Sequence, residues 1–438
     1  MEIKNWGIVG GGIMGMTLAH RLSQQGHKVT IYEAAPELGG LVSPWTMDDV
    51  EWDKFYHVIL LSDSRTRAIL KEIGLEDKIE WVETKTGFYI NGKLHSMSNT
   101  IEFLKFPTLN LIDKFRLGLT ILVASRIKDW NRLEKIPVTK WLRRWSGTRT
   151  YKKIWLPLLR AKLGESYNKT SAVFIWATIQ RLYGARRSGL KKEMFGFIPG
   201  GYKTVIEAFK QTLLLEGVEI KTNHTAKEVK TSGNGKTNIL FAADQKREFD
   251  KVVITLPSSI SCKLCPQLSL EEKQKLNDIE YLGVICVAVL LDKSLSNFYI
   301  TNITDSQIPF TGVIEMSALV NKKHLNGKAL VYLPKYVLAK DPLFNKSDEQ
   351  IKDYFLYNFK KMYPSLKDSD IKFSGVAKAK HVITVAKLNY SETLPDVTTS
   401  IPGVYIINTS HIKDGTLNVN ETVRVAETKL DEILNDKI

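Results

Sequence analysis

Residues 6–40 read WGIVGGGIMGMTLAHRLSQQGHKVTIYEAAPELGG, and they set the architecture of the chain. The apolar run Trp6 to Val9 has the length and composition of a buried strand. A glycine-rich turn, Gly10 to Gly15, comes next, and helical spacing of apolar residues follows it. A second strand, Lys28 to Tyr32, then leads to an acidic residue, Glu33. The segment predicts a complete β-α-β unit with a G-x-G-x-x-G turn and an acid in register.

The glycines of this turn have separate physical roles. Gly10 permits the tight turn, Gly12 keeps a side chain away from a bound pyrophosphate, and Gly15 lets helix and strand pack closely. The phosphates would lie on the free amides at the helix start, those of Ile13 and Met14, where the helix dipole is positive. The turn therefore predicts a nucleotide-binding site.

Glu33 indicates which nucleotides the unit accepts. A carboxylate at this position accepts hydrogen bonds from ribose hydroxyls and favours an unphosphorylated ribose, so FAD or NAD is expected rather than NADP. Beyond Glu33 comes Gly39-Gly40-Leu41, an E-x5-G-G pattern. This pattern resembles that of the flavoprotein superfamily that contains amine oxidases, protoporphyrinogen oxidases, phytoene desaturases and UDP-galactopyranose mutases. The resemblance implies FAD, with Gly39, Gly40 and Leu41 beside it.

Composition limits the class of protein further. A chain of 438 residues is too long for one ordinary domain, so we expect two. The 62 Lys and Arg against 47 Asp and Glu give a net charge of +15, which attracts phosphates, anionic lipid headgroups or nucleic acid without choosing among them. We do not expect nucleic-acid binding, because no recognisable reading module accompanies the charge. The first apolar segment is already the predicted nucleotide-binding strand, so no signal peptide is visible and we expect a cytoplasmic protein.

Later segments extend the resemblance along the chain. It implies that the backbone around Val229 faces the adenine, and that Asp250 to Pro257 is another strand of the nucleotide-binding sheet. Near the end, Asn408-Thr409-Ser410 replaces the Gly-Asp of the superfamily, and an amide can still bond a ribityl group. Asn418 and Asn420 lie where a helix cap belongs, and the positive helix end would stabilise a reduced, anionic flavin.

One histidine is the candidate catalytic residue. In related flavoproteins an Asp or Gly and a His often lie near the isoalloxazine ring, and Asp53 and His57 match that pattern approximately. The resemblance therefore makes His57 the polar group expected to face the flavin. The alternative is a histidine whose hydrogen bonds are satisfied at a strand edge. We predict no metal site, since neither a metal cluster nor a rival catalytic set has readable spacing.

Two local signals predict elements of a second domain. Asn91-Gly92 lies between alternating residues and is the strongest short signal for a hairpin. Asn110 is a plausible cap for a helix that carries one apolar stripe, made of Ile112, Phe115, Leu119 and Leu122.

The segment Lys140 to Lys162 interleaves three tryptophans with eight Lys and Arg. Such a pattern is typical of a surface that rests on an anionic membrane, which makes peripheral membrane binding one interpretation. The other interpretation is a pair of solvated helices whose tryptophans lie in the core. The sequence leaves both open, since Gly147 and Pro157 interrupt the segment.

The resemblance implies an α/β protein with a Rossmann-like FAD-binding domain and a discontinuous α+β substrate domain. We assign residues 1–80, 195–280 and 385–438 to the first and residues 81–194 and 281–384 to the second. The function expected is an FAD-dependent oxidoreductase, of dehydrogenase, desaturase or oxidase type, that transfers hydride between flavin and a small-molecule substrate, hydrophobic or lipid-linked. The alternatives are a flavin-dependent sugar-nucleotide mutase without net redox change and a non-catalytic flavin-binding scaffold.

Overall fold

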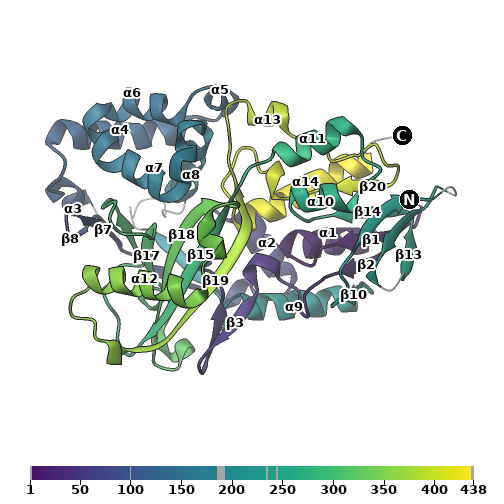
Figure 1. Ribbon diagram of the computed structural model, residues 1–438, viewed down its shortest axis with the longest axis horizontal. Coiled ribbons are helices and arrows are strands. Elements are labelled where there is room, and N and C mark those ends of the chain that lie inside the picture. Colours follow the sequence, from purple (N-terminus) through teal and green to yellow (C-terminus); the bar gives the residue numbers. More distant parts are fainter. Residues whose placement is uncertain (1, 99, 185–192, 233–234, 243–244, 436–438) are drawn as a thin grey trace.

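The computed structural model describes residues 2–98, 100–184, 193–232, 235–242 and 245–435, which form two lobes (Figure 1). Both chain ends lie at the lobe on the right of that view. This nucleotide lobe is built on a parallel sheet whose order is β10 (Glu219–Lys221), β2 (Lys28–Tyr32), β1 (Asn5–Val9), β14 (Lys251–Ile254) and β20 (Val404–Ile406).

Both faces of the parallel sheet are covered. Alternate residues of its strands point to opposite sides, so each face packs through its own set of side chains. Ile8 and Val253 point to one face, and the helices packed there are α1 (Ile13–Gln24), α2 (Ser64–Glu72), α9 (Gly201–Leu215) and α14 (Val419–Asn435). Val9 and Ile254 point to the other, which is covered by the sheet β11 (Glu228–Thr231), β12 (Thr237–Leu240) and β13 (Lys246–Phe249) and by the helices α10 (Ser258–Leu264) and α11 (Leu270–Asp278).

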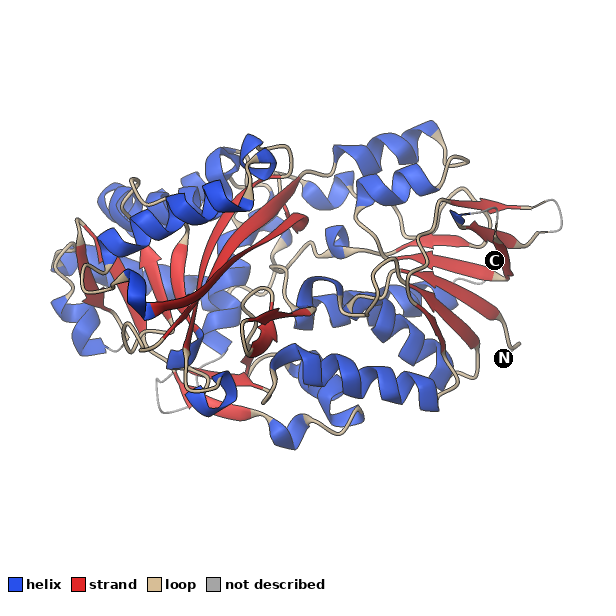
Figure 2. Ribbon diagram, turned by 60° about the horizontal axis from the view of Figure 1, so that its bottom comes forward, coloured by secondary structure: helices blue, strands red, loops and turns tan. Residues whose placement is uncertain are grey.

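The second lobe contains a seven-stranded, mostly antiparallel sheet (Figure 2). Its order is β19 (Ile371–Thr384), β15 (Tyr281–Leu291), β18 (Ala329–Leu338), β17 (Gly312–Glu315), β16 (Ile300–Ile303), β7 (Thr86–Ile90) and β8 (Lys93–Ser96). Strand β15 is buried on both faces along its whole length. Helix α12 (Asp348–Met362) packs on one face, and the other faces the nucleotide lobe through Trp52, Phe195 and Phe197.

Helices from residues 100–184 form a layer at one end of this sheet (Figure 1). They are α3 (Thr100–Lys105), α4 (Leu111–Arg126), α5 (Asn131–Glu134), α6 (Val138–Thr150), a π-helical turn (Tyr151–Trp155), α7 (Leu156–Leu163) and α8 (Val173–Gly184). Gly147 interrupts α6 with a φ of +80°, and Pro157 lies in the first turn of α7. The interruptions predicted for residues 140–162 are therefore present.

Short strands connect the lobes. β3 (Pro44–Met47) pairs with β4 (Val50–Asp53), and β9 (Met194–Phe197) lies between β5 (Ile59–Leu60) and β6 (Glu80–Glu83). The parallel sheet uses strands only from residues 1–80, 195–280 and 385–438, and the seven-stranded sheet only from 81–194 and 281–384. These two sheets agree with the predicted division, whereas β6 and β9 each cross one of its boundaries, and the domain boundaries themselves stay a prediction.

The hairpin and the capped helix predicted for the second lobe are both present. Asn91 and Gly92 join β7 to β8 with φ values of +52° and +74°. Asn110 caps α4 in a capping box with Asp113. The direction of the α4 stripe is a surprise, since Ile112 and Phe115 are each 71% exposed. Leu117, Thr120 and Ala124 form the buried side of this helix.

The positions of two tryptophans in residues 140–162 decide between a core role and a membrane-facing role for their side chains. Trp141 and Trp155 are buried with Leu142 and Leu159 in the core of the helical layer. Their indole rings therefore do not form the membrane-facing surface, and the core interpretation is right for these two. Within the part of the chain that the structure describes, no helix has both the length and the apolar composition needed to cross a membrane.

Candidate functional site

The turn between β1 and α1 has the geometry that its glycines predict. Gly10 has a φ of +114°, a conformation that L side chains rarely adopt. A Cβ atom on Gly15 would lie 1.9 Å from the carbonyl oxygen of Gly10. Only glycine at position 15 lets the helix begin so close to the strand.

Gly12 differs from these two glycines. Its φ of −75° and ψ of −179° are open to other residues, and a Cβ atom there would meet no described protein atom within 4 Å. The loop Gly39-Gly40 lies beside it, because the amide of Gly39 donates to the carbonyl of Gly11 over 2.9 Å. Leu41, only partly buried, lies in the short 3-10 helix Gly40–Val42.

The first amides of α1 face this space. Gly12 is the N-cap and offers no side-chain oxygen, so the amides of Ile13 and Met14 depend on an external acceptor. The side chains of both residues are buried. Together with the positive end of the helix dipole, this arrangement suits a phosphate anion.

The carboxylate of Glu33 is held by two backbone amides. Oε2 accepts from Gly11 over 2.7 Å, and Oε1 accepts from Ala35 over 2.8 Å. A carboxylate has about four acceptor sites, so it can accept ribose hydroxyls as well. Glu33 is thus oriented next to the glycine turn, and its ribose contact stays a prediction.

Val229 lies on β11, an edge strand of the three-stranded sheet. Its side chain is fully buried beside Val9 and Tyr32, and its backbone pairs with Ile239 of β12. The adenine contact predicted for this backbone stays a prediction, and the edge position is compatible with it.

Asn408 does not have the role that the sequence predicts. Its side chain is 1% exposed, and its amide nitrogen donates to the Leu256 carbonyl and to Ser258 Oγ. Its amide oxygen accepts from the backbone and from the hydroxyl of Ser410. These four bonds use the hydrogen-bonding capacity of the amide, so Asn408 joins β20 to the loop after β14 instead of reaching a ribityl group.

The two asparagines at the start of α14 have different partners. Asn418 Oδ1 accepts from the amide of Glu421, as the cap of α14 should. Asn420 Oδ1 instead accepts from the amides of Arg65 and Thr66 at the start of α2. The cap prediction is right for Asn418 and wrong for Asn420, which joins the first turns of two helices.

His57 lies beside a buried carboxylate. Its Nδ1 is 3.5 Å from Oδ2 of Asp53, and its ring makes an edge contact with Tyr202 at 5.2 Å between centroids. Asp53 Oδ1 accepts from the Tyr202 amide at the start of α9. Burial raises the pKa of Tyr202, so its hydroxyl stays protonated at neutral pH. The structure therefore gives His57 a fixed neighbourhood, and its catalytic role stays a prediction.

A set of residues where the lobes meet is not predicted from the sequence. Tyr56, one residue before His57, shares a 2.6 Å hydrogen bond with Tyr336 of β18. Lys162 Nζ lies 3.5 Å from the centroid of the Tyr336 ring. Its members come from three segments that are far apart in the sequence, so no pattern of residue spacing predicts that they meet. The only sequence signal that could have drawn attention to Tyr56 is its place next to His57.

Comparisons with known proteins place the chain. The sequence pattern of the flavin containing amine oxidoreductase family matches residues 13–386. A 15-cis-phytoene desaturase from Capsicum annuum is 22% identical over 421 aligned residues, which cover 89% of this chain and 69% of that protein. An oxidoreductase from Methanosarcina mazei superposes with a TM-score of 0.76 at 18% identity, over 98% of this chain and 100% of that one.

A further solved structure shares the fold. Reduced UDP-galactopyranose mutase superposes with a TM-score of 0.74 at 15% identity, over 98% of this chain and 95% of that one. The fold class and the superfamily that the sequence resembles are thus confirmed. Because the family pattern covers most of its length, the chain is an oxidoreductase that belongs to the flavin containing amine oxidoreductase family.

Proposed function

We propose that the chain binds FAD noncovalently and transfers hydride between the flavin and a hydrophobic or lipid-linked substrate. The first amides of α1 would hold the pyrophosphate, Glu33 the adenosine ribose and the edge of β11 near Val229 the adenine. When bound, FAD supplies the hydride chemistry, and the protein supplies binding and orientation. His57, placed beside Asp53, is the polar group proposed to face the flavin.

The open space at Gly12 carries this proposal. Glycine is usually required by a positive φ or by close packing, and Gly12 has neither within the protein. A side chain there would instead enter the space in front of the α1 amides. The residue type is therefore explained by a group outside the chain, and the cofactor of this family fits it.

The substrate class rests on separate support. The curated relatives include 15-cis-phytoene desaturases and zeta-carotene desaturases, at 21% to 24% identity. Tyr56 and Tyr336 meet among apolar side chains, a setting that suits an apolar substrate.

Gly12→Val tests the cofactor part of the proposal. We expect the purified wild type to show flavin absorbance and to release one FAD per chain on denaturation, identified by chromatography against FMN. Gly12→Val should fold and lose at least about tenfold in FAD content, because its side chain takes the space of the pyrophosphate.

Gly118→Val is the matched control, since this glycine also has no described atom within 4 Å of its Cβ position but lies on α4. It should keep its full flavin content. Full flavin in Gly12→Val, or FMN in the wild type, would contradict the assignment.

The reaction is tested under anaerobic conditions. A detergent-solubilised polyene of the phytoene type should bleach the oxidised flavin if it is the hydride donor, and a polyene with more double bonds should reoxidise the reduced flavin. A protein that reacts with neither polyene and that, once its flavin is reduced, isomerises UDP-galactopyranose without net redox change would instead be a mutase.

A further inference from the structure

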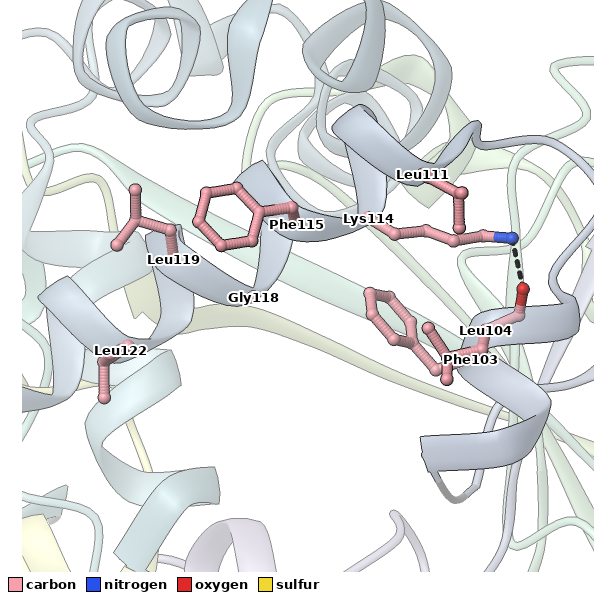
Figure 3. Close-up of a pocket in the computed structure, with 8 residues that line it drawn as sticks. All are labelled: Phe103, Leu104, Leu111, Lys114, Phe115, Gly118, Leu119 and Leu122. Atoms are coloured by element: carbon pink, nitrogen blue, oxygen red, sulfur yellow. Dashed lines mark hydrogen bonds between the residues drawn. The ribbon is translucent and has the colours of Figure 1, made fainter.

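Helices α3 and α4 expose a continuous apolar surface, which we call the α3–α4 face. Its large apolar side chains are exposed by 38% to 74%. Four of them, Leu104, Leu111, Phe115 and Leu122, border a groove of about 400 Å³ between the two helices (Figure 3). The Lys114 side chain extends from α4 toward α3, and its Nζ donates to the Leu104 carbonyl over 2.5 Å. The exposed members of the face are Ile101, Leu104, Leu111, Ile112, Phe115 and Leu122.

This exposure is not a side effect of a poorly packed helix. The other side of α4 packs on the core through Leu117 and Ala124, both at most 4% exposed. Gly118 lies in the groove with no described atom near its Cβ position, so the hollow is kept open where a side chain would fit. A large exposed apolar patch on an otherwise well-packed protein marks an interaction surface.

Basic residues are concentrated in the helical layer that carries this face. Residues 100–162 contain 15 Lys and Arg against 4 Asp and Glu, which is +11 of the chain's net charge of +15. Lys153 Nζ donates to the carbonyl of Thr108 in the loop between α3 and α4, over 3.0 Å. Arg116 of α4 donates to the carbonyl of Arg144 over 2.9 Å, which fixes α6 against α4. Arg144 and Lys152 are themselves exposed.

We propose that the α3–α4 face docks on a lipid bilayer that contains anionic lipids. The apolar side chains enter the boundary between headgroups and acyl chains, and the basic residues of α6 and the π-helical turn meet the lipid phosphates. The positive charge of the helical layer complements anionic headgroups, and this complementarity selects the occupant. The inference extends the substrate part of the proposed function, since a bilayer is where a hydrophobic substrate resides.

Sedimentation with vesicles tests the docking. The wild type should pellet with phosphatidylcholine vesicles that contain phosphatidylserine, and much less with phosphatidylcholine alone. Phe115→Asp combined with Ile112→Asp should reduce binding by about tenfold or more, because each change removes exposed apolar contact and adds like charge to the headgroups. Arg144→Gln combined with Lys152→Gln should reduce binding to anionic vesicles only, and added salt should act in the same direction.

Leu215→Asp is the matched control, because Leu215 is 89% exposed on α9 in the other lobe. It should bind vesicles as the wild type does. Gly12→Val should also bind normally, so that failure of the cofactor assignment is distinguished from failure of docking.

Three outcomes would overturn the proposal. The wild type could stay in the supernatant with both vesicles, or the Phe115→Asp, Ile112→Asp protein could pellet like the wild type. The third is a wild-type dimer in sedimentation velocity that becomes a monomer on the same double change, since the occupant of the face would then be a second copy of this chain.

Discussion

Helices α1 and α4 look alike in sequence and differ in what surrounds them. Each has apolar residues at helical spacing and a glycine within the helix. In α1 Leu18 is fully buried, and a Cβ on Gly15 would collide with a backbone oxygen. In α4 Phe115 is 71% exposed, and a Cβ on Gly118 would meet nothing described. The difference teaches that the chain covers the sides of α1 and leaves open only the space before its first turn, whereas along α4 it leaves one whole side exposed.

The largest effect should come from Gly15→Ala. The added methyl group would lie 1.9 Å from the Gly10 oxygen, and a backbone atom cannot move aside as a side-chain end can. We expect the free energy of unfolding to fall by about 3 kcal/mol or more, measured by urea denaturation without cofactor. A wild-type midpoint would show that the β1–α1 turn is not tightly packed, and the contrast with α4 would disappear.

The second effect concerns pH. Burial lowers the pKa of His411, near the end of β20, from 6.5 to about 4. Between these values the unfolded chain binds a proton that the folded chain does not, so the free energy of unfolding should fall with falling pH. The loss should level off below about pH 4 and reach at most about 3 kcal/mol. Denaturation curves from pH 7 to pH 4 measure it.

His411→Gln should remove this part of the pH dependence. Phe115→His is the control that completes the comparison, because an exposed imidazole titrates alike in the folded and unfolded chains and should add no slope. An unchanged slope in His411→Gln would assign the pH dependence to other groups.

The two smallest effects concern α4, and the first of them should have the opposite sign. Gly118→Ala should raise the free energy of unfolding by about 1 kcal/mol, because alanine is the better helix former and its methyl group meets no described atom. Phe115→Ala should change it by less than about 0.5 kcal/mol. Thermal or urea unfolding of the two variants measures both. A loss of several kcal/mol in Phe115→Ala would mean that the α3–α4 face is packed in the free protein.

Sequence reasoning succeeded where neighbours in the chain determine the structure. The β-α-β unit needs only the glycines and the apolar spacing between Trp6 and Glu33, and the hairpin needs only Asn91-Gly92 to supply two positive φ values. Asn110 caps α4 through a residue three positions on. Each of these signals lies within one or two consecutive elements.

It failed where the partner is distant. Asn420 reaches an amide 355 positions earlier in the chain, and Asn408 reaches one carbonyl 152 positions earlier. The apolar spacing of α4 correctly indicated a helix, but spacing does not tell which apolar residues are covered. Likewise Trp141 and Trp155 are core residues because of helices that pack around them, a property that the charges beside them in the sequence conceal.

The order of strands in the parallel sheet has a consequence for the synthesis of this protein. Strand β1 leaves the ribosome first, yet its neighbour β14 begins at Lys251 and the edge strand β20 at Val404. During most of translation one edge of an apolar central strand is therefore unpaired and open to strands of other nascent chains. The nucleotide lobe is completed only when α14 packs against α1, so a chain interrupted before residue 404 should be a substrate for chaperones and proteases, however well its other lobe has folded.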